Sequence, residues 1–162
     1  MKTAPTLHTE RLTLRSFKFE DAQDVQRLAG DRDIAATLTR MPHPYKEGMA
    51  EKWIRSCYEN FKKDAAINFA ITLRTEKHLI GGIALRIDRE NENAELGYWI
   101  GKPYWNRGYC TEAAKAVVGH SFEVLKLNRI HAKYFKRNPA SGRVLEKIGM
   151  YYEGCFRQHV KK

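Results

Sequence analysis

The sequence is poor in the features that mark secreted, membrane-spanning and metal-binding proteins. It has only three cysteines, which are odd in number and far apart, so neither a disulfide framework nor a zinc site is indicated. No apolar run approaches the length of a membrane span, and the first residues lack the apolar core of a signal peptide. Internal repeats, low-complexity tracts and linkers are lacking too. These absences predict a cytoplasmic protein with one domain over residues 1–162, no metal and no membrane partner.

What the chain does have is enough apolar material for one core and an excess of positive charge. Its 162 residues are 43% hydrophobic, which suits a single globular domain. The formal net charge of +10 favours an anionic partner, such as RNA, a ribosome or a phosphorylated cofactor. The basic residues are spread along the chain, so a merely solvated basic surface is compatible with the same composition.

The alternation and periodicity of apolar residues predict an α+β domain. We expect a mixed sheet, helices on both of its faces, and parallel pairing across helical connections. Strands are expected over residues 10–15, 68–73, 79–87, 94–100, 129–134 and 151–157. Helices are expected over residues 19–29, 33–38, 47–61, 111–125 and 138–149.

Residues 94–113 combine a buried strand, a loop and the start of a helix. Gly108 lets the loop approach a ligand closely, and Thr111 is a suitable N-cap. The apolar face of this helix is expected to be Ala114, Val117, Val118, Phe122 and Leu125. Free amides and the macrodipole at a helix N-terminus favour a bound phosphate. An ordinary strand-to-helix turn has the same spacing, so both interpretations stay open on this pattern alone.

Four segments, taken together and in order, resemble a known family. They are Thr9-Glu-Arg-Leu-Thr-Leu-Arg15, Ala94-Glu-Leu-Gly-Tyr-Trp-Ile100, Trp105-Asn-Arg-Gly-Tyr-Cys-Thr-Glu-Ala113 and Asn138-Pro-Ala-Ser-Gly-Arg-Val-Leu-Glu-Lys-Ile-Gly-Met150. The chain is similar to GNAT-fold N-acetyltransferases, in the branch of bacterial ribosomal-protein N-terminal acetyltransferases (RimJ/RimL-like). The resemblance implies a largely antiparallel mixed sheet with two splayed parallel central strands. It also implies acetyl-CoA as co-substrate.

In such proteins acetyl-CoA lies in a V-shaped opening between the two splayed strands, here 94–100 and 129–134. Backbone groups of the first strand pair with the pantetheine amides, as an added strand would. The pyrophosphate binds amides at the helix N-terminus. The residues that the resemblance assigns to the cofactor are Tyr98, Trp99, Ile100, Arg107, Gly108, Tyr109, Cys110, Thr111 and Asn138. Cys110 is interpreted as a packing residue, since this chemistry needs no covalent enzyme intermediate.

The last predicted helix departs from the family pattern. Many members carry a tyrosine there as general acid for the leaving thiolate, but the matching residue is Leu145. Ser141 is the nearest hydroxyl and the natural substitute, although it can equally bond to its own backbone. Asn138 either binds the cofactor, caps its helix, or does both.

The implied reaction is direct attack of a neutral amine on the thioester. A backbone N–H near Trp99 or Ile100 is the expected donor to the oxyanion. Glu95 is the candidate base within the motif, but alternation puts it opposite Tyr98, and a surface carboxylate is the favoured interpretation. A water chain suffices as an alternative, because an α-amine has a pKa of about 8. We therefore hypothesise that no single residue is an indispensable base.

The acceptor is expected to be a protein N-terminus, on a ribosomal protein by resemblance. Residues 41–45 and the helix that carries Trp53 are predicted to form one wall of its pocket, with His43 and Tyr45 as conceivable contacts. A small-molecule amine is an alternative acceptor. A non-catalytic CoA-binding protein and an RNA- or ribosome-binding module are the alternatives from other classes.

The end of the chain is also unusual for the family. Relatives usually continue with another strand that pairs with residues 151–157, whereas this sequence stops at Lys162. Either the terminus is trimmed, further residues lie outside this sequence, or a partner supplies the edge. An exposed last strand favours association. A homodimer is therefore among the expected partners.

Overall fold

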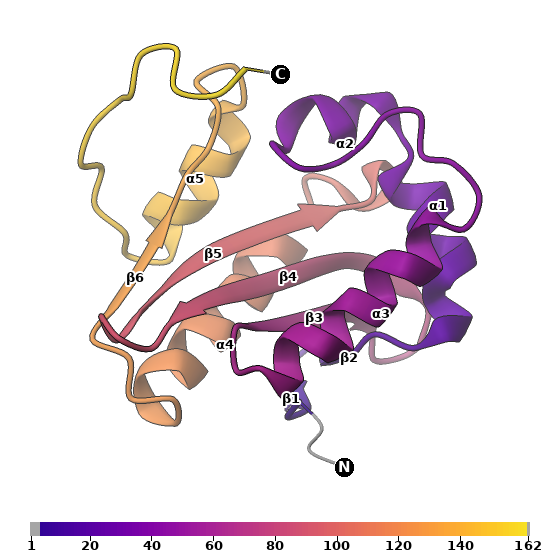
Figure 1. Cartoon of the computed structure of the whole chain (residues 1–162), viewed down its shortest axis with the longest axis horizontal. Helices are drawn as coiled ribbons and strands as arrows, with labels where there is room; N and C mark the ends of the chain where they lie inside the picture. The colour runs from indigo at the N-terminus through magenta and orange to yellow at the C-terminus, as the bar shows by residue number, and fades with distance from the viewer. Residues whose placement is uncertain (1–3, 162) are drawn as a thin grey trace.

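The strands of the sheet follow one another in the same order as in the chain (Figure 1). The computed structural model describes residues 4–161, and within this range six strands form one sheet in the order β1-β2-β3-β4-β5-β6. Their bounds are β1 Leu7–His8, β2 Leu12–Ser16, β3 Ala66–Leu73, β4 Leu79–Asp88, β5 Asn93–Ile100 and β6 Arg129–Ala132. Neighbours from β1 to β5 pair antiparallel, while β5 and β6 pair parallel. The predicted mixed, largely antiparallel sheet is confirmed.

Helices cover both faces of this sheet. They are α1 Ala22–Ala29, α2 Arg32–Thr37, α3 Met49–Lys62, α4 Tyr109–Glu123 and α5 Pro139–Lys147, with short 3₁₀ turns η1 Phe19–Asp21 and η2 Lys102–Tyr104. One apolar cluster joins α4 and α5 to the strands, and a second joins α1 and α3 to the opposite face. The alternation of β3 shows the division, because Phe69 packs in the first cluster and Ala70 in the second.

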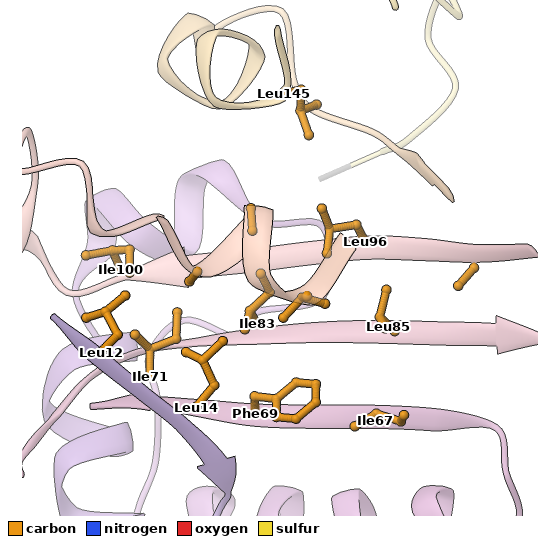
Figure 2. Packing of buried hydrophobic residues seen from close by; sticks show 14 of the residues in the cluster. Leu12, Leu14, Ile67, Phe69, Ile71, Ile83, Leu85, Leu96, Ile100 and Leu145 are labelled. Carbon is orange, nitrogen blue, oxygen red and sulfur yellow. The ribbon is translucent and has the colours of Figure 1, made fainter. Parts of the chain in front are cut away.

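The first cluster is the larger core, and it fixes where α5 lies (Figure 2). Leu12 and Leu14 of β2 are fully buried beside Phe69 of β3. At the other edge, Leu145 of α5 lies above Leu96 of β5 in Figure 2, and both side chains are buried. Leu145 therefore packs in the core at the position where many family members carry a tyrosine.

The predicted last strand is wrong. Residues 151–161 form neither helix nor strand, and Tyr151, Tyr152 and Phe156 are exposed. A strand needs a partner for its backbone N–H and C=O groups. The contact recorded between this segment and β6 is instead a side-chain ion pair, in which Arg129 Nη2 lies 2.6 Å from Glu153 Oε2.

The start of α4 also differs from the prediction. Thr111 is not the N-cap, because the helix already begins at Tyr109 and Gly108 occupies the cap position with φ +76°. The buried face of α4 consists of Ala113, Ala114, Val117 and Ser121, so Phe122, expected inside, lies off this face and is 43% exposed. No helix among the described residues has the length and apolar character needed to span a membrane.

Candidate active site

The parallel strands β5 and β6 diverge after a short ladder. The register runs from Asn93 opposite Arg129 to Leu96 opposite Ala132, and β6 ends there. Strand β5 continues to Ile100, while the chain beyond β6 turns away towards α5 (Figure 1). The predicted splay is therefore present, and it opens beside the last four residues of β5.

Only alternate peptide groups of β5 face this opening. The Glu92 carbonyl accepts from Asn128 N on the β6 side at 2.7 Å, and Gly101 N donates to Ile80 O of β4 at 2.8 Å. Because backbone groups alternate along a strand, Tyr98 and Ile100 face the opening, whereas Trp99 faces β4. The Ile100 carbonyl accepts from Trp105 Nε1 at 2.7 Å. The groups presented to the opening are therefore the N–H and C=O of Tyr98 and the N–H of Ile100.

The side chain of Trp99 lies on the face covered by α1 and α3. It packs against the second cluster, and its Nε1 is 2.7 Å from where a Cβ on Gly82 would stand. Glycine at position 82 is therefore needed to make room for the indole. The three neighbouring residues predicted for the cofactor thus have different positions, since the Trp99 side chain lies on the face opposite Tyr98 and Ile100.

The loop after β5 leads directly into the N-terminus of α4. The first intrahelical bond is Glu112 N to Gly108 O at 3.0 Å, so the amides of Tyr109, Cys110 and Thr111 precede the helical ladder. A cavity of about 350 Å³ lies beside them, lined by Glu10, Gly108, Thr111, Glu112, Lys115 and Lys147. The lining carries two carboxylates as well as two lysines, so the free amides of the helix N-terminus are the feature that favours an anion at this position.

A side chain from the N-terminal part of the chain holds this loop. Arg11 Nε donates to Glu112 Oε2 at 2.7 Å, and its Nη1 donates to the Arg107 carbonyl at 2.9 Å. The guanidinium carbon lies 4.5 Å from the centre of the Tyr109 ring. One arginine therefore contacts the loop, the first residue of α4 and its first turn.

The carboxylate of Glu112 completes this arrangement. Its Oε1 accepts from Thr9 Oγ1 at 2.6 Å and from the Arg11 backbone N–H at 2.9 Å. Burial raises the pKa of Glu112, but the hydrogen bonds from Thr9 and Arg11 and the charge of Arg11 outweigh it, so the pKa is lowered. The carboxylate is therefore ionised at neutral pH, and it neutralises Arg11 beside the cavity.

Tyr98 and Ser141 meet at the opening. The Tyr98 hydroxyl lies 2.9 Å from Ser141 Oγ and 3.0 Å from the Ser141 carbonyl oxygen. Burial raises the pKa of the Tyr98 phenol, and the hydrogen bond to Ser141 offsets this only in part. The serine predicted from the sequence is therefore beside β5 rather than turned to solvent.

The other predicted cofactor residues surround the same region. Asn138 occupies the N-cap position of α5, but its side chain makes no capping hydrogen bond, so the capping alternative does not explain it. Arg107 is exposed. Burial raises the pKa of the Cys110 thiol to about 12, which is consistent with a packing residue and not with a nucleophile.

Comparison with known proteins agrees with this geometry. Residues 11–151 match the family model described as the acetyltransferase (GNAT) domain. The chain belongs to the GNAT acetyltransferase family. The predicted family is therefore confirmed, and the protein is an acetyl-CoA-dependent N-acetyltransferase.

Three similar proteins illustrate how this GNAT chain relates to others. An uncharacterized N-acetyltransferase of Bacillus licheniformis, p20, is 31% identical over 157 residues, 96% of this chain and 88% of that protein. The ribosomal-protein-serine acetyltransferase of Escherichia coli (strain K12) is 34% identical over 84 residues, 51% of this chain and 47% of that protein. A solved structure described as RimL, a ribosomal L7/L12 alpha-N-protein acetyltransferase in complex with coenzyme A, matches with a TM-score of 0.89 at 17% identity, over 97% of this chain and 90% of that one. This last likeness shows the fold.

Glu95 of the GNAT sheet lies on the face opposite Tyr98, in a cluster of basic groups. Its carboxylate is 2.9 Å from Arg86 Nη1, 3.2 Å from Lys133 Nζ and 3.7 Å from His131 Nε2. Burial raises the pKa of Glu95, but the hydrogen bond from Lys133 and the surrounding positive charges outweigh it and lower the pKa. A carboxylate stabilised in this way is a weak proton acceptor.

Two contacts connect helix α2 to the segments that flank the opening. Lys102, which follows β5, forms an ion pair with Asp33 of α2, and Arg137 Nη2, which precedes α5, donates to the Ala36 carbonyl at 2.9 Å. Helix α2 is thus connected to both sides of the divergence.

The two predicted acceptor contacts differ in burial. Tyr45 packs with Trp99 in the second cluster, and burial raises the pKa of Tyr45 to about 12, whereas His43 is exposed.

Sequence reasoning missed the contacts made by Arg11, Glu112 and Thr9. The segment 9–15 was recognised only as part of a family pattern, and no local signal pairs it with residues a hundred positions later. The signal that could have found these contacts is a charged side chain in a predicted strand that packs next to a candidate binding loop. Among the described residues, no group of histidine, cysteine and acidic side chains is arranged to hold a metal ion.

Proposed function

We propose that the protein transfers the acetyl group of acetyl-CoA to the N-terminal amine of a protein. The observation that carries this proposal is the divergence of β5 from β6 beside the N-terminus of α4. The peptide groups of Tyr98 and Ile100 offer a strand-like edge to the pantetheine amides. The amides of residues 109–111 offer a site for the pyrophosphate.

The residues around this opening allow a close approach of the backbone to acetyl-CoA and supply positive charge. Gly108 adopts a left-handed conformation without strain and leaves the amides uncovered. Lys115 and Lys147 line the adjacent cavity and supply positive charge for the phosphates. Asn138 and Arg107 contribute a polar amide and a charge at the two ends of the region.

In the proposed reaction a neutral amine attacks the thioester carbonyl, so that the C–N bond forms and the C–S bond breaks. The Ile100 N–H is the donor we assign to the oxyanion, because Trp99 directs its own N–H to β4. Ser141 donates to the departing sulfur. Glu95 lies on the other face with its pKa lowered, which favours water over this carboxylate as the acceptor of the amine proton.

The choice of acceptor is supported by relatives and by charge. One relative is named for acetylating serine on ribosomal proteins. The net charge of +10 suits an acceptor bound to a ribosome. It disfavours a polyamine.

Thermal unfolding with and without acetyl-CoA tests the cofactor site. At a ligand concentration of 100 times Kd the native state gains about 2.7 kcal/mol, which raises the melting temperature by roughly 5 to 10 °C at this chain length. Gly108→Asp should abolish the rise, because it places a carboxylate beside the pyrophosphate. Gly108→Asn is the matched control, since asparagine has the same shape and tolerates positive φ without the charge. Equal loss in both variants would indicate backbone strain instead of an anion site.

Release of the CoA thiol tests the acceptor. Peptides with a free N-terminal serine or alanine should be acetylated, and the same peptides with a blocked α-amine should not. Turnover of blocked peptides at internal lysines, or of small amines alone, would overturn the acceptor assignment while leaving the cofactor site intact. An acetyl-CoA-dependent rise in melting temperature without turnover of any amine would favour a non-catalytic CoA-binding protein.

A further inference from the structure

The side chains of Tyr98 and Ser141 form a contact between two hydroxyl groups, in which either group can be the hydrogen-bond donor. A hydroxyl group carries one proton, and Ser141 can donate to the sulfur only when that proton is not directed elsewhere. The Tyr98 hydroxyl oxygen is 2.9 Å from Ser141 Oγ, so each hydroxyl competes for the lone pairs of the other. Which of them donates decides whether Ser141 can assist the leaving group.

We propose that Tyr98 is a positioning residue for the reaction: its phenol donates to Ser141 Oγ and leaves the Ser141 proton free for the sulfur of the departing coenzyme A. This inference rests on the proposed function. Tyr98 touches neither the thioester nor the amine through its side chain and acts through Ser141.

Two hydrogen-bond arrangements are compatible with the heavy atoms. In one, the phenol donates to the Ser141 carbonyl at 3.0 Å and accepts the Ser141 proton. In the other, the phenol donates to Ser141 Oγ, and the Ser141 proton points away from Tyr98. Negative charge that develops on sulfur attracts a donor and therefore favours the second arrangement. The change requires only the rotation of two hydroxyl groups, because both oxygens stay in place.

The surroundings of Tyr98 suit a fixed donor. Its ring packs on the first apolar cluster, and its peptide groups belong to β5. Burial raises the pKa of the phenol, so Tyr98 keeps its proton throughout the neutral range. Ser141 is held equally firmly, since its amide donates to the Asn138 carbonyl at 3.2 Å in the first turn of α5.

The proton balance closes without another reagent. The sulfur takes the electron pair of the broken C–S bond and the proton of Ser141. The resulting serine oxygen is stabilised by the phenol and regains a proton from water, which has received the proton that the amine lost. Tyr98 is unchanged at the end of the cycle.

A double-mutant cycle tests the inference with the serine-ended peptide as acceptor. Ser141→Ala should lower kcat by about 100-fold, within the range for general acid catalysis. Tyr98→Phe should lower kcat by about tenfold with the KM for acetyl-CoA unchanged, because only the hydroxyl is removed. In the Ser141→Ala background, Tyr98→Phe should cause no further loss, since the residue through which it acts is gone.

Tyr58→Phe is the matched control. It also removes a tyrosine hydroxyl that donates to a backbone carbonyl, that of Phe17, but on α3. Both phenylalanine variants should lower the melting temperature slightly, and only Tyr98→Phe should lower kcat. Additive losses in the double mutant, or an unchanged kcat for Tyr98→Phe alone, would overturn the inference while leaving the proposed function standing. Full activity of Ser141→Ala, or no acetylation by the unmodified protein, would overturn the proposed chemistry and this inference with it.

Discussion

Arg11 and Glu112 are joined by a 2.7 Å ion pair although 101 positions separate them in the chain. The pair connects the residue immediately before β2 to the first turn of α4. Through its second bond, to the Arg107 carbonyl, Arg11 also holds the loop that we assign to the pyrophosphate. The shape of this loop therefore depends on a residue outside it.

Arg11→Ala should weaken acetyl-CoA binding. Loss of the charge-assisted bonds frees the loop and leaves Glu112 unneutralised beside the phosphates, so we expect KM for acetyl-CoA to rise by about tenfold. The KM for the acceptor should not change. Arg89→Ala is the control. It breaks a comparable exposed ion pair, in which Arg89 Nε lies 2.8 Å from Asp64 Oδ2, and neither residue belongs to α4. Similar kinetic effects of both substitutions would contradict a specific role for Arg11.

The same pair predicts a dependence of stability on pH. The pKa of Glu112 is lower in the folded protein than in the unfolded chain. The contribution of Glu112 to the free energy of unfolding is therefore complete above its pKa in the unfolded chain, about 4.3, and is lost as the pH falls through its pKa in the folded protein. Glu112→Gln should remove this part of the acid sensitivity, so that the wild type loses more unfolding free energy than the variant between neutral pH and about pH 3. The unfolding free energies are measured by urea titration at each pH. If those of the wild type and the variant change with pH in parallel, the carboxylate makes no such contribution.

Glu95→Gln should change the rate little. Glu95 already interacts with Lys133 and Arg86, and its lowered pKa makes it a weak base. We expect kcat to fall by less than about tenfold, compared with the 10²–10⁴-fold typical when a general base is removed. A loss of several orders of magnitude with acetyl-CoA binding unchanged would show that Glu95 is an indispensable base after all.

Arg137→Ala should act on the acceptor side. Its bond to the Ala36 carbonyl holds α2 beside the opening. A freed α2 should raise the KM for the acceptor peptide about fivefold, the effect of one hydrogen bond of about 1 kcal/mol. The KM for acetyl-CoA should stay constant. Lys136→Ala removes a neighbouring positive charge and serves as the control, so equal effects would point to bulk electrostatics instead of contact with α2.

Sequence patterns predicted the sheet and most helices because apolar spacing reports burial directly. The strand over residues 94–100 and the parallel partner that follows α4 are both present. Alternation would also have separated Trp99 from Tyr98 and Ile100, since three successive peptide groups cannot all face one side. The assignment of these residues to acetyl-CoA stays a prediction, as do the homodimer and the cytoplasmic location.

Two kinds of feature were beyond local patterns. The strand predicted over residues 151–157 has the composition of a strand, but composition does not report whether the backbone groups of a segment find a partner in the sheet. The contacts of Arg11 depend on the packing of β2 against α4, which is fixed only in three dimensions. Helix caps were similarly uncertain, because Gly108 and Thr111 are both acceptable at a helix start.

The identical order of strands in chain and sheet has a consequence for local stability. Strands β3, β4 and β5 are connected to one another by short turns, whereas β6 joins through the whole of α4 and pairs over only four residues. Partial opening should therefore begin at β6 and spread to α5 while the antiparallel strands remain intact. The proposed acetyl-CoA site lies on this less stable border, so bound ligand would slow amide hydrogen exchange most in β6 and α5, far more than in β3 and β4.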